Sequence, residues 1–263
     1  MAEDSYILSE VVDRVALFTL NRPELMNAMG PDMHDTLNGL IRDAGADPGV
    51  GVIMLTGAGR AFCAGRDMKA AARTQGEAPR GPAPRRSGLA NYMELIRRIP
   101  KPVIAAVNGP AVGGGMSLAL ACDMRIASER AMFSQAFIKR GVIPAGGAIY
   151  VLPRLIGTAK ACELMLSGDP IGAKEAKRLG IVNRVVPHEE LMDAAMAWAR
   201  QLAAGAPVAL GLAKASIYRT MELDLKTSLE AESFAQDVCG DTEDHAEGVA
   251  AFVEKRPPRF KGQ

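Results

Sequence analysis

The chain has few aromatic residues, few cysteines and no excess of charge of either sign. Lysine and arginine number 31 and aspartate and glutamate 30, so the net charge is +1 and a chain-wide basic surface for nucleic acid is excluded. No apolar run approaches the ~18 residues that a membrane-spanning helix requires. The composition therefore predicts neither a nucleic-acid partner nor a membrane partner.

Cysteines are scattered along the sequence, at Cys63, Cys122, Cys162 and Cys239. They form no CxxC pair and have no ligand-like spacing with histidine, so we expect no metal site and no redox pair, but free thiols in a reducing compartment. Residues 1–5 are acidic and polar, unlike the basic start and apolar run of a signal peptide. These features predict a cytoplasmic protein.

What the sequence does contain is apolar residues, which make up 48% of the chain and suffice for a packed core. The pattern predicts strands at residues 15–20, 50–56, 102–107 and 123–127. The run at 50–56 is almost wholly apolar, which is typical of a strand buried on both faces. Apolar spacing predicts helices at residues 32–46, from 89 to just before Pro100, and at 116–122. This alternation favours an α/β fold.

The second half of the sequence is mostly helical in pattern. Helices are expected at residues 158–166, 173–179 and 189–202, with one strand at 181–186 and two or three further helices within 207–254. We therefore divide the chain into a core, residues 1–200, and a C-terminal helical region, residues 201–263. Residues 70–88, rich in proline and arginine, are predicted to form a loop.

Glycine-bearing turns follow two of the predicted strands, but neither is a nucleotide site. Gly57 and Gly59 start a dinucleotide-binding pattern, but Phe62 stands where its third glycine is needed. The turn at residues 109–116 lacks the lysine and the serine or threonine of a phosphate-binding loop. Both nucleotide interpretations are set aside.

Residues 113–115 are three glycines at the start of a predicted helix, where main-chain N–H groups have no helical acceptor. Such N–H groups can form an oxyanion hole, and the Ala64 N–H is a candidate second donor. The glycines can equally serve only to let two segments of backbone pack closely. From spacing alone, both interpretations remain open.

Several segments, in order along the chain, carry a resemblance to one family. They are Asn21-Arg22-Pro23 with Asn27-Ala28, residues 61–69, 101–109, 112–119, 133–137, 141–147, 166–170 and 173–187, and Arg259-Phe260-Lys261-Gly262. Together they resemble the enoyl-CoA hydratase/isomerase (crotonase) family from about residue 15 to 262. The resemblance implies an α/β spiral of ββα units with a C-terminal helical region that forms trimers, which often pair into hexamers.

The resemblance also implies a ligand and a site. The ligand is an acyl-CoA thioester, with coenzyme A as part of the substrate and no tightly bound cofactor, and the partner is a second copy of the chain. The implied oxyanion hole is the N–H of Ala64 and of Gly114. The implied substrate-binding residues are Ala64, Gly65, Arg66, Asp67, Met68, Gly114, Phe137 and Ala145, with Phe260 and Lys261 reaching the CoA of a neighbouring subunit.

The catalytic acids of the family are missing from their usual places. Hydratases of the family use two glutamates, whose places are taken here by Ser117 and Phe137. The stretch 133–141 resembles more closely a branch with delta-3,delta-2 enoyl-CoA isomerases and the ring-epoxide isomerase of phenylacetate breakdown. The single acid of that branch falls at Ala145. Proton transfer next to a thioester normally needs a carboxylate, so the proton-handling group is the open question.

Three functions stay open on the sequence. The first is an isomerase-type or hydratase-type enzyme with unusual proton handling, in which Ser117 is a weak candidate. The second is an acyl-CoA-binding protein that has lost catalysis, and the third a thioester hydrolase or decarboxylase. Asp67 is expected to hold its turn, and Arg66 to pair with Asp67, steer an acidic acyl group or lie in solvent. The histidines are scattered and not expected to be catalytic.

Overall fold

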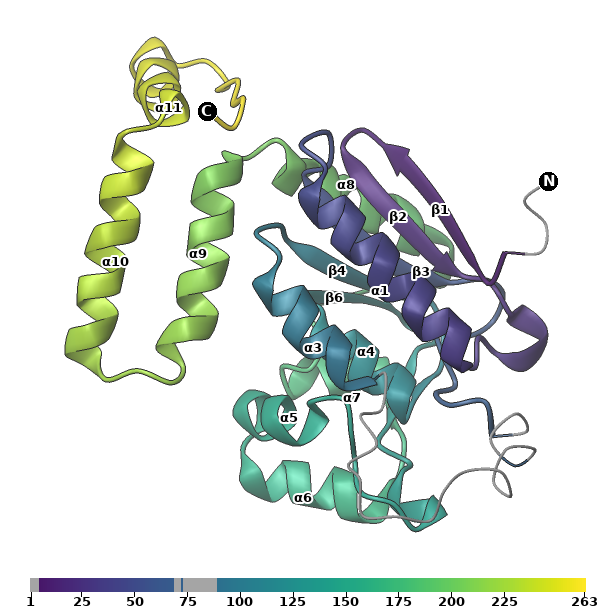
Figure 1. The fold of residues 1–263 in the computed structure, drawn as a ribbon. Helices are drawn as coiled ribbons and strands as arrows, with labels where there is room; N and C mark the ends of the chain where they lie inside the picture. The colour runs from purple at the N-terminus through teal and green to yellow at the C-terminus, as the bar shows by residue number, and fades with distance from the viewer. Residues whose placement is uncertain (1–4, 69–71, 73–88) are drawn as a thin grey trace.

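The computed structural model describes residues 5–68, 72 and 89–263. The segment predicted as a loop at 70–88 lies outside the described residues, apart from Ala72. The described part has a central twisted sheet with helices on both faces, and a group of helices that extends from one side (Figure 1).

Six strands of the described residues form the central sheet, in the order β1-β2-β3-β4-β6-β9. They are β1 (Ile7–Val12), β2 (Val15–Leu20), β3 (Val52–Gly57), β4 (Val103–Val107), β6 (Met124–Ser128) and β9 (Arg184–Val186). β1 pairs with β2 antiparallel, and each following pair is parallel. A smaller sheet has the order β5-β7-β8, formed by β5 (Ala111–Val112), β7 (Met132–Ser134) and β8 (Ile171–Gly172).

The apolar run of β3 is buried on both faces, as predicted. Ile53 and Leu55 pack into the larger apolar cluster with α1, α3 and α4, and Val52 and Met54 pack into a second cluster with α8. Because side chains alternate along a strand, one unbroken apolar run supplies both layers. The predicted strands at 15–20, 102–107 and 123–127 are confirmed within one residue at each end as β2, β4 and β6.

The helices of the core follow the predicted periodicity closely. They are α1 (Pro31–Ala46), α3 (Leu89–Arg98), α4 (Gly114–Ala121), α5 (Ala148–Ile156), α6 (Thr158–Ser167), α7 (Ala173–Arg178) and α8 (Leu191–Ala203), with 3-10 turns η1 (Pro23–Leu25), η2 (Ile138–Arg140) and η3 (His188–Glu190). Helix α5 and strand β1 are not expected from the sequence, and neither are the short strands β5, β7 and β8. Pro153 lies within α5 and argues against a helix in the sequence, although Ala148, Val151 and Leu152 are buried at helical spacing. Five of the six β1 residues are exposed, so β1 has no buried face.

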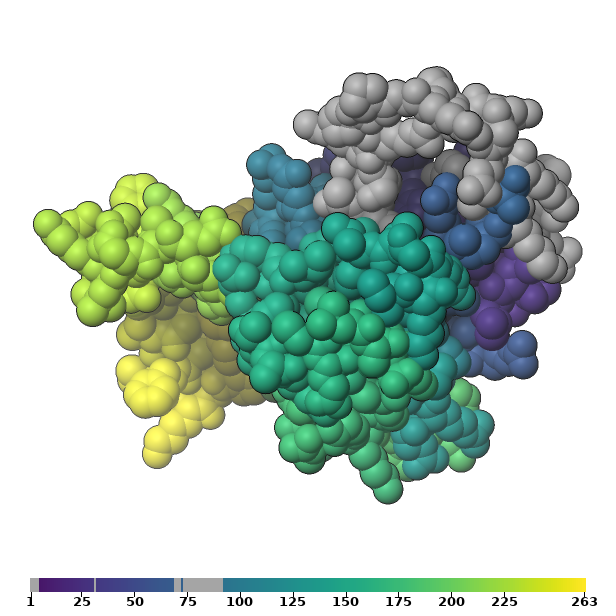
Figure 2. Space-filling model, turned by 90° about the horizontal axis from the view of Figure 1, so that it is seen from below, coloured from purple at the N-terminus to yellow at the C-terminus, as the bar shows by residue number. Residues whose placement is uncertain are grey.

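Residues 207–263 form what we term the C-terminal arm: α9 (Pro207–Thr220), α10 (Leu225–Gly240), α11 (Glu243–Glu254) and the tail that follows. Figure 2 shows it projecting beyond the core. Side chains cap two of its helices, since Asp224 accepts the Thr227 N–H at 3.0 Å and Thr242 accepts the His245 N–H at 3.1 Å. No helix of the described residues combines the length and apolar character that crossing a bilayer requires.

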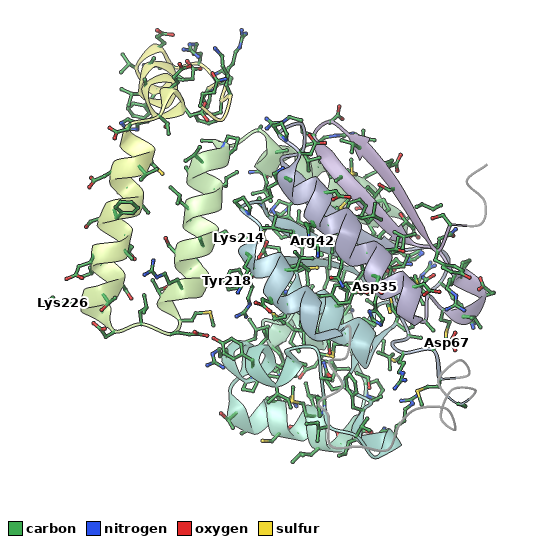
Figure 3. All side chains as sticks on the ribbon, in the orientation of Figure 1. Asp35, Arg42, Asp67, Lys214, Tyr218 and Lys226 are labelled. Atoms are coloured by element: carbon green, nitrogen blue, oxygen red, sulfur yellow. The ribbon has the colours of Figure 1, made fainter. Side chains whose placement is uncertain are left out.

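A buried polar cluster fixes α9 to the core. The Lys214 ammonium lies 2.7 Å from one Asp123 carboxylate oxygen, and the Tyr218 hydroxyl donates to the other at 2.7 Å. Lys214 and Tyr218 project from α9 toward the core (Figure 3). Asp123 also accepts the Val103 N–H at 2.7 Å, so the same carboxylate binds the arm and the start of β4.

Candidate functional site

Two segments distant in sequence lie backbone to backbone at one end of the sheet. The Cys63 N–H donates to the Pro110 carbonyl at 3.1 Å, and the Val112 N–H donates to the Cys63 carbonyl at 2.9 Å. This parallel bridge between Cys63 and Ala111 joins the loop after β3 to the start of α4. The turn motif and the three glycines singled out in the sequence are thereby brought together.

An asparagine of the first motif supports the loop. The side-chain amide of Asn27 donates to the Ala61 carbonyl at 2.7 Å and to the Ala58 carbonyl at 2.9 Å, and its oxygen accepts the Arg22 N–H at 2.9 Å. Asn27 is fully buried, so each of these bonds replaces a lost contact with water. The 21–28 motif therefore shapes the loop that leads into the site.

Glycine is required where the two segments touch. A Cβ added at Gly115 would lie 2.0 Å from the Cys63 carbonyl oxygen. Gly65 has a φ of +89°, and a Cβ there would lie 2.7 Å from the Val112 oxygen and 3.2 Å from the Gly114 nitrogen. Close packing is thus what Gly115 allows, as one of the two interpretations expected, and the same close approach at Gly65 places that residue directly beside the Gly114 amide.

The Ala64 amide, expected as an oxyanion donor, is already occupied. Its N–H donates to the Met26 carbonyl at 2.9 Å. The direction in which each amide of the loop points depends on contacts with residues 22–29, which the motif alone does not reveal. In this structure Ala64 faces the 22–28 segment, so it is not a free donor.

The Arg66 amide is oriented differently. The Met29 N–H donates to the Gly65 carbonyl at 2.7 Å, and the Asp67 N–H donates to the Met29 carbonyl at 3.0 Å. In this parallel bridge, the N–H of the residue between Gly65 and Asp67 points away from Met29. The Arg66 N–H has no hydrogen-bond partner among the described residues.

The Gly114 amide is the second donor on this surface. Gly114 is the first residue of α4, and the first helical hydrogen bond runs from the Ser117 N–H to the Gly113 carbonyl, at 3.0 Å. The Gly114 N–H therefore lacks a helical acceptor and has no other partner within the described part of the chain. Two unoccupied amides, those of Arg66 and Gly114, lie on adjoining backbones beside the positive end of a helix dipole.

Ser117, Phe137 and Ala145 gather around the same helix start. The Ser117 hydroxyl donates to the Ala145 carbonyl at 2.8 Å and lies 3.2 Å from the Gly113 carbonyl. The Phe137 ring lies 3.8 Å from where a Cβ of Gly113 would stand. Ser117 is buried and its hydroxyl faces two carbonyls, so it ties α4 to the 142–147 turn and has no neighbour here that could make it a base.

Asp67 stabilises the loop through Arg22. Its carboxylate lies 3.1 Å from an Arg22 guanidinium nitrogen, and Arg22 also donates to the Ala28 carbonyl at 2.9 Å. Asp67 is 9% exposed, whereas the neighbouring Arg66 and Met68 side chains are exposed. The ion pair of Asp67 is therefore with Arg22 and not with Arg66, and it attaches the loop to the segment before α1.

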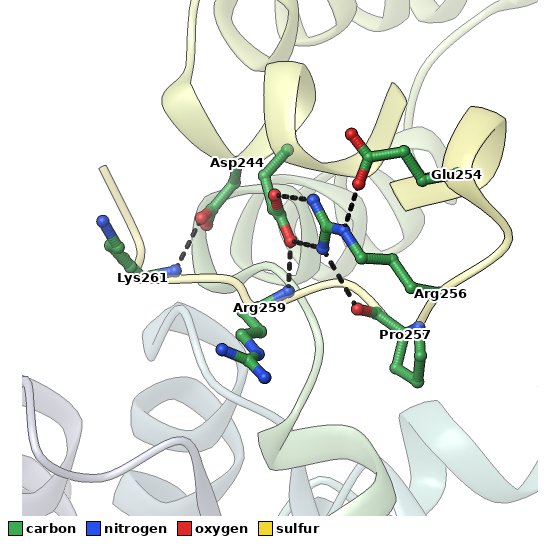
Figure 4. Close-up of polar contacts among 7 residues, drawn as sticks. Asp244, Glu254, Arg256, Pro257, Arg259 and Lys261 are labelled. Atoms are coloured by element: carbon green, nitrogen blue, oxygen red, sulfur yellow. Dashed lines mark hydrogen bonds and ion pairs between the residues drawn. The ribbon is translucent and has the colours of Figure 1, made fainter. Parts of the chain in front are cut away.

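The tail residues implied in CoA binding lie elsewhere in the chain. The Asp244 carboxylate accepts the N–H groups of Lys261 at 2.6 Å and Gly262 at 2.8 Å, which holds the tail against α11 (Figure 4). Figure 1 shows this end of the arm far from the start of α4. Within one chain, the structure does not bring Phe260 or Lys261 to the Arg66 and Gly114 amides.

The remaining reactive side chains offer neither a nucleophile at the loop nor a metal site among the described residues. Burial raises the pKa of the Cys63 thiol to about 12, so it stays protonated at neutral pH and is a poor nucleophile. Across residues 5–68, 72 and 89–263, histidine, cysteine and carboxylate side chains form no group of three that could hold a metal ion.

A titratable pair near the loop was missed by the sequence analysis. The His34 Nδ1 lies 2.7 Å from the Tyr92 hydroxyl oxygen, across 58 residues of sequence. Neither residue belongs to a motif, and no periodicity links them. Only the packing of α1 against α3 reveals the pair, so no signal in a single sequence could have found it.

Comparison with known proteins agrees along nearly the whole chain. The family model described as Enoyl-CoA hydratase/isomerase matches residues 10–263. The 1,2-epoxyphenylacetyl-CoA isomerase of Escherichia coli (strain K12) is 41% identical over 263 residues, covering 98% of this chain and 99% of that protein. The short-chain-enoyl-CoA hydratase of Clostridium acetobutylicum is 39% identical over 257 residues, 95% of each chain. The solved enoyl-CoA hydratase of Bacillus anthracis has a TM-score of 0.91 at 36% identity, covering 98% of this chain and 100% of that one.

Proposed function

Because the chain belongs to the enoyl-CoA hydratase/isomerase family, we propose that it binds the CoA thioester of an unsaturated acid and stabilises the enolate of that thioester. The α/β fold with a C-terminal helical region that the resemblance implied is the fold of its solved relatives. Coenzyme A enters as part of the substrate, and no bound cofactor is needed for this chemistry.

The observation that carries the proposal is the pair of unoccupied amides. The Arg66 and Gly114 N–H groups lie on backbones that meet at Gly65, and both lack partners among the residues described. A thioester oxygen between them would receive two hydrogen bonds as negative charge develops on it. One such donor is worth a factor of roughly 10² to 10³ in rate. The oxyanion hole thus consists of Arg66 and Gly114, in place of Ala64 and Gly114.

We further propose an isomerase rather than a hydratase. Addition of water needs side chains that hold and deprotonate it, and Phe137 places an apolar ring beside Gly113 instead. The Ser117 hydroxyl is committed to the Ala145 carbonyl. An isomerase only moves a proton along the acyl chain, and an isomerase is among the most similar relatives.

We propose that the arm completes the protein as a homo-oligomer, a trimer or a dimer of trimers. Apolar side chains on it are exposed in the single chain: Ile217, Leu225, Phe234, Phe252 and Val253, of which Phe252 is 86% exposed. Surfaces of this kind mark contacts with another subunit. Phe260 and Lys261 would then reach the CoA of a neighbour, and the free cysteines support action in the cytoplasm.

The test removes one amide and leaves the helix in place. Proline is favoured at the first position of a helix, so Gly114→Pro deletes the N–H with little cost to α4. We expect turnover of 2-enoyl- and 3-enoyl-CoA to fall by roughly 10² to 10³. Thr158→Pro, at the equivalent position of α6, is the matched control and should keep wild-type turnover. Equal turnover in both variants would contradict the oxyanion hole.

Two other outcomes distinguish the alternative functions. Tight binding of acyl-CoA by calorimetry, without turnover of any enoyl-CoA, would support an acyl-CoA-binding protein. Release of free CoA, read by a thiol reagent, would support a thioester hydrolase. Both tests are needed because Ser117, Phe137 and Ala145 carry no carboxylate that could transfer a proton.

A further inference from the structure

A histidine and a tyrosine form a hydrogen-bonded pair between α1 and α3. The His34 Nδ1 and the Tyr92 hydroxyl oxygen are 2.7 Å apart, and the ring centroids are 5.4 Å apart. Tyr92 is 1% exposed, whereas His34 is only half-buried. The Tyr92 hydroxyl also faces the His34 main-chain carbonyl at 3.4 Å. One ring nitrogen of His34 is therefore held, while Nε2 has no hydrogen-bond partner among the described residues.

The pair is connected, through neighbouring residues, to two segments of the proposed thioester site. His34 is in the first turns of α1, and its N–H donates to the Gly30 carbonyl, next to the Met29 that bridges Arg66. The residue after Tyr92 packs on the other side, because a Cβ at Gly147 would lie 2.8 Å from Cε of Met93. Gly147 ends the turn that contains Ala145.

Electrostatics keeps both members of the pair neutral at neutral pH. Burial lowers the pKa of His34, the nearby Arg66 lowers it further, and Asp35 opposes the shift. Burial raises the pKa of the Tyr92 phenol, and the neighbouring Cys63 and Asp35 raise it further. A neutral imidazole next to a neutral phenol is in the protonation state that a general base requires.

Resting on the function proposed above, we propose that His34 is the base that moves the proton, with Tyr92 as the residue that positions it. In the tautomer used, Nδ1–H donates to the Tyr92 oxygen, the Tyr92 hydroxyl donates to the His34 carbonyl, and Nε2 carries a free electron pair. Nε2 takes a proton from the acyl chain, and the electrons of that C–H bond form the enolate, whose oxygen accepts from Arg66 and Gly114. The imidazolium then returns the proton to another carbon, the double bond shifts, and no co-reactant is consumed.

Other candidates for this role are engaged elsewhere. Asp67 is paired with Arg22 at 3.1 Å. The Nδ1 of His188 lies 2.9 Å from the Ser128 hydroxyl, beside β6 and β9, and His245 is on α11 in the arm. His188 has one held ring nitrogen, as His34 has, so it provides the matched control.

The experiment measures proton transfer directly. Exchange of acyl Cα protons of butyryl-CoA in D2O is followed by NMR, and isomerisation of 3-hexenoyl-CoA by absorbance. We expect His34→Gln to lower both rates by roughly 10² to 10⁴ with unchanged binding by calorimetry. Tyr92→Phe should retain part of both rates, and the pH profile of these rates should shift. His188→Gln should have the wild-type rates.

The pH profile of the wild type tests the same proposal without any variant. Since the pKa of His34 is lowered from 6.5, the rate should fall only as the pH drops below that value. A folded His34→Gln variant with the wild-type rate and the wild-type decrease of rate at low pH would overturn the proposal. If only Gly114→Pro lost rate, the oxyanion hole would still be supported and the role of His34 would not. A wild type that binds acyl-CoA but exchanges no proton would overturn both His34 and the isomerase.

Discussion

The amide site and the C-terminal arm are constructed in opposite ways. At the site, backbone packs on backbone, and a single added Cβ at Gly115 would lie 2.0 Å from a carbonyl oxygen. In the arm, side chains make the contacts in solvent, as in the Arg256–Glu247 pair at 2.6 Å. The proposed oxyanion hole uses the main-chain N–H of Arg66, whereas Gly115 cannot be replaced without moving the backbone.

The junction between the two regions combines features of both. Lys214 of the arm and Asp123 of the core have side chains only 7% and 13% exposed. Burial lowers the pKa of Lys214, and Asp123 opposes that shift by attraction and a hydrogen bond. A charged pair this deep depends on both partners, whereas an exposed pair at the same distance does not.

The largest effect on turnover is expected at the site. Gly115→Ala forces Cys63 and Gly115 apart, so we expect a loss of about 1–3 kcal/mol in the free energy of unfolding. Moving the start of α4 also displaces the Gly114 amide, so turnover should fall by roughly 10² or more. Urea unfolding and enoyl-CoA assays on the same preparation measure the two effects.

Gly39→Ala is the matched control for that substitution. Gly39 also lies within a helix, but apart from its chain neighbours and the nearby backbone of its own helix no atom lies within 4 Å of its added Cβ. Alanine there should raise stability by about 0.5–1 kcal/mol with unchanged turnover. If both alanine variants behaved alike, close backbone approach would not be what distinguishes the site from the rest of the molecule.

The next effect concerns the junction. Lys214→Met leaves the buried Asp123 carboxylate without its cation, although Tyr218 and the Val103 N–H still donate to it. Breaking a buried pair in this way costs about 3–5 kcal/mol of stability, but the site amides stay in place. We therefore expect a lower urea midpoint and an unaltered KM at low denaturant.

An exposed pair supplies the comparison for Lys214. Arg98 and Glu94 are 2.7 Å apart with side chains 78% and 65% exposed. Arg98→Ala should change stability by no more than about 0.5 kcal/mol. A loss from Arg98→Ala as large as that from Lys214→Met would show that contact distance, and not burial, sets the value of these pairs.

Much of this architecture follows from the sequence, since apolar runs and glycine turns report directly on burial and backbone shape. The strand at 15–20 and the helix at 32–46 are found within a residue of their predicted ends. β1 and α5 were missed because exposure and an internal Pro153 hide their periodicity. Local pattern therefore predicts long apolar elements well, and it misses an exposed strand and a helix that contains proline.

The site shows where one sequence ceases to be informative. The sequence directs attention to the loop and the three glycines, but the amide without a partner among the described residues is that of Arg66, because hydrogen-bond direction depends on a bridge to Met29 that no local pattern encodes. The His34–Tyr92 pair depends on packing of α1 against α3. Both features arise from contacts between distant segments.

The smallest effect is expected in the exposed part of the arm, although its contacts are as short as those of the buried junction. Glu247 accepts from Arg256 at 2.6 and 2.8 Å and from the Arg259 N–H at 2.7 Å (Figure 4). Arg256 and the Arg259 N–H lower the pKa of Glu247 to about 2.

A carboxylate whose pKa is lowered by folding stabilises the fold at pH values above its unfolded pKa of about 4.3. That contribution is lost as the pH falls toward 2. Hydrogen exchange of the tail, read by mass spectrometry, should increase only slightly in Glu247→Gln at pH 7. The wild type should lose the same small protection between pH 4 and 2, where Glu247 becomes protonated, and the variant should not change over that range. Glu254→Gln, which removes a single Arg256 contact, is the control. If Glu247→Gln released the tail at pH 7, the cluster would stabilise the protein as strongly as the buried junction does, and the comparison with exposed pairs would be wrong.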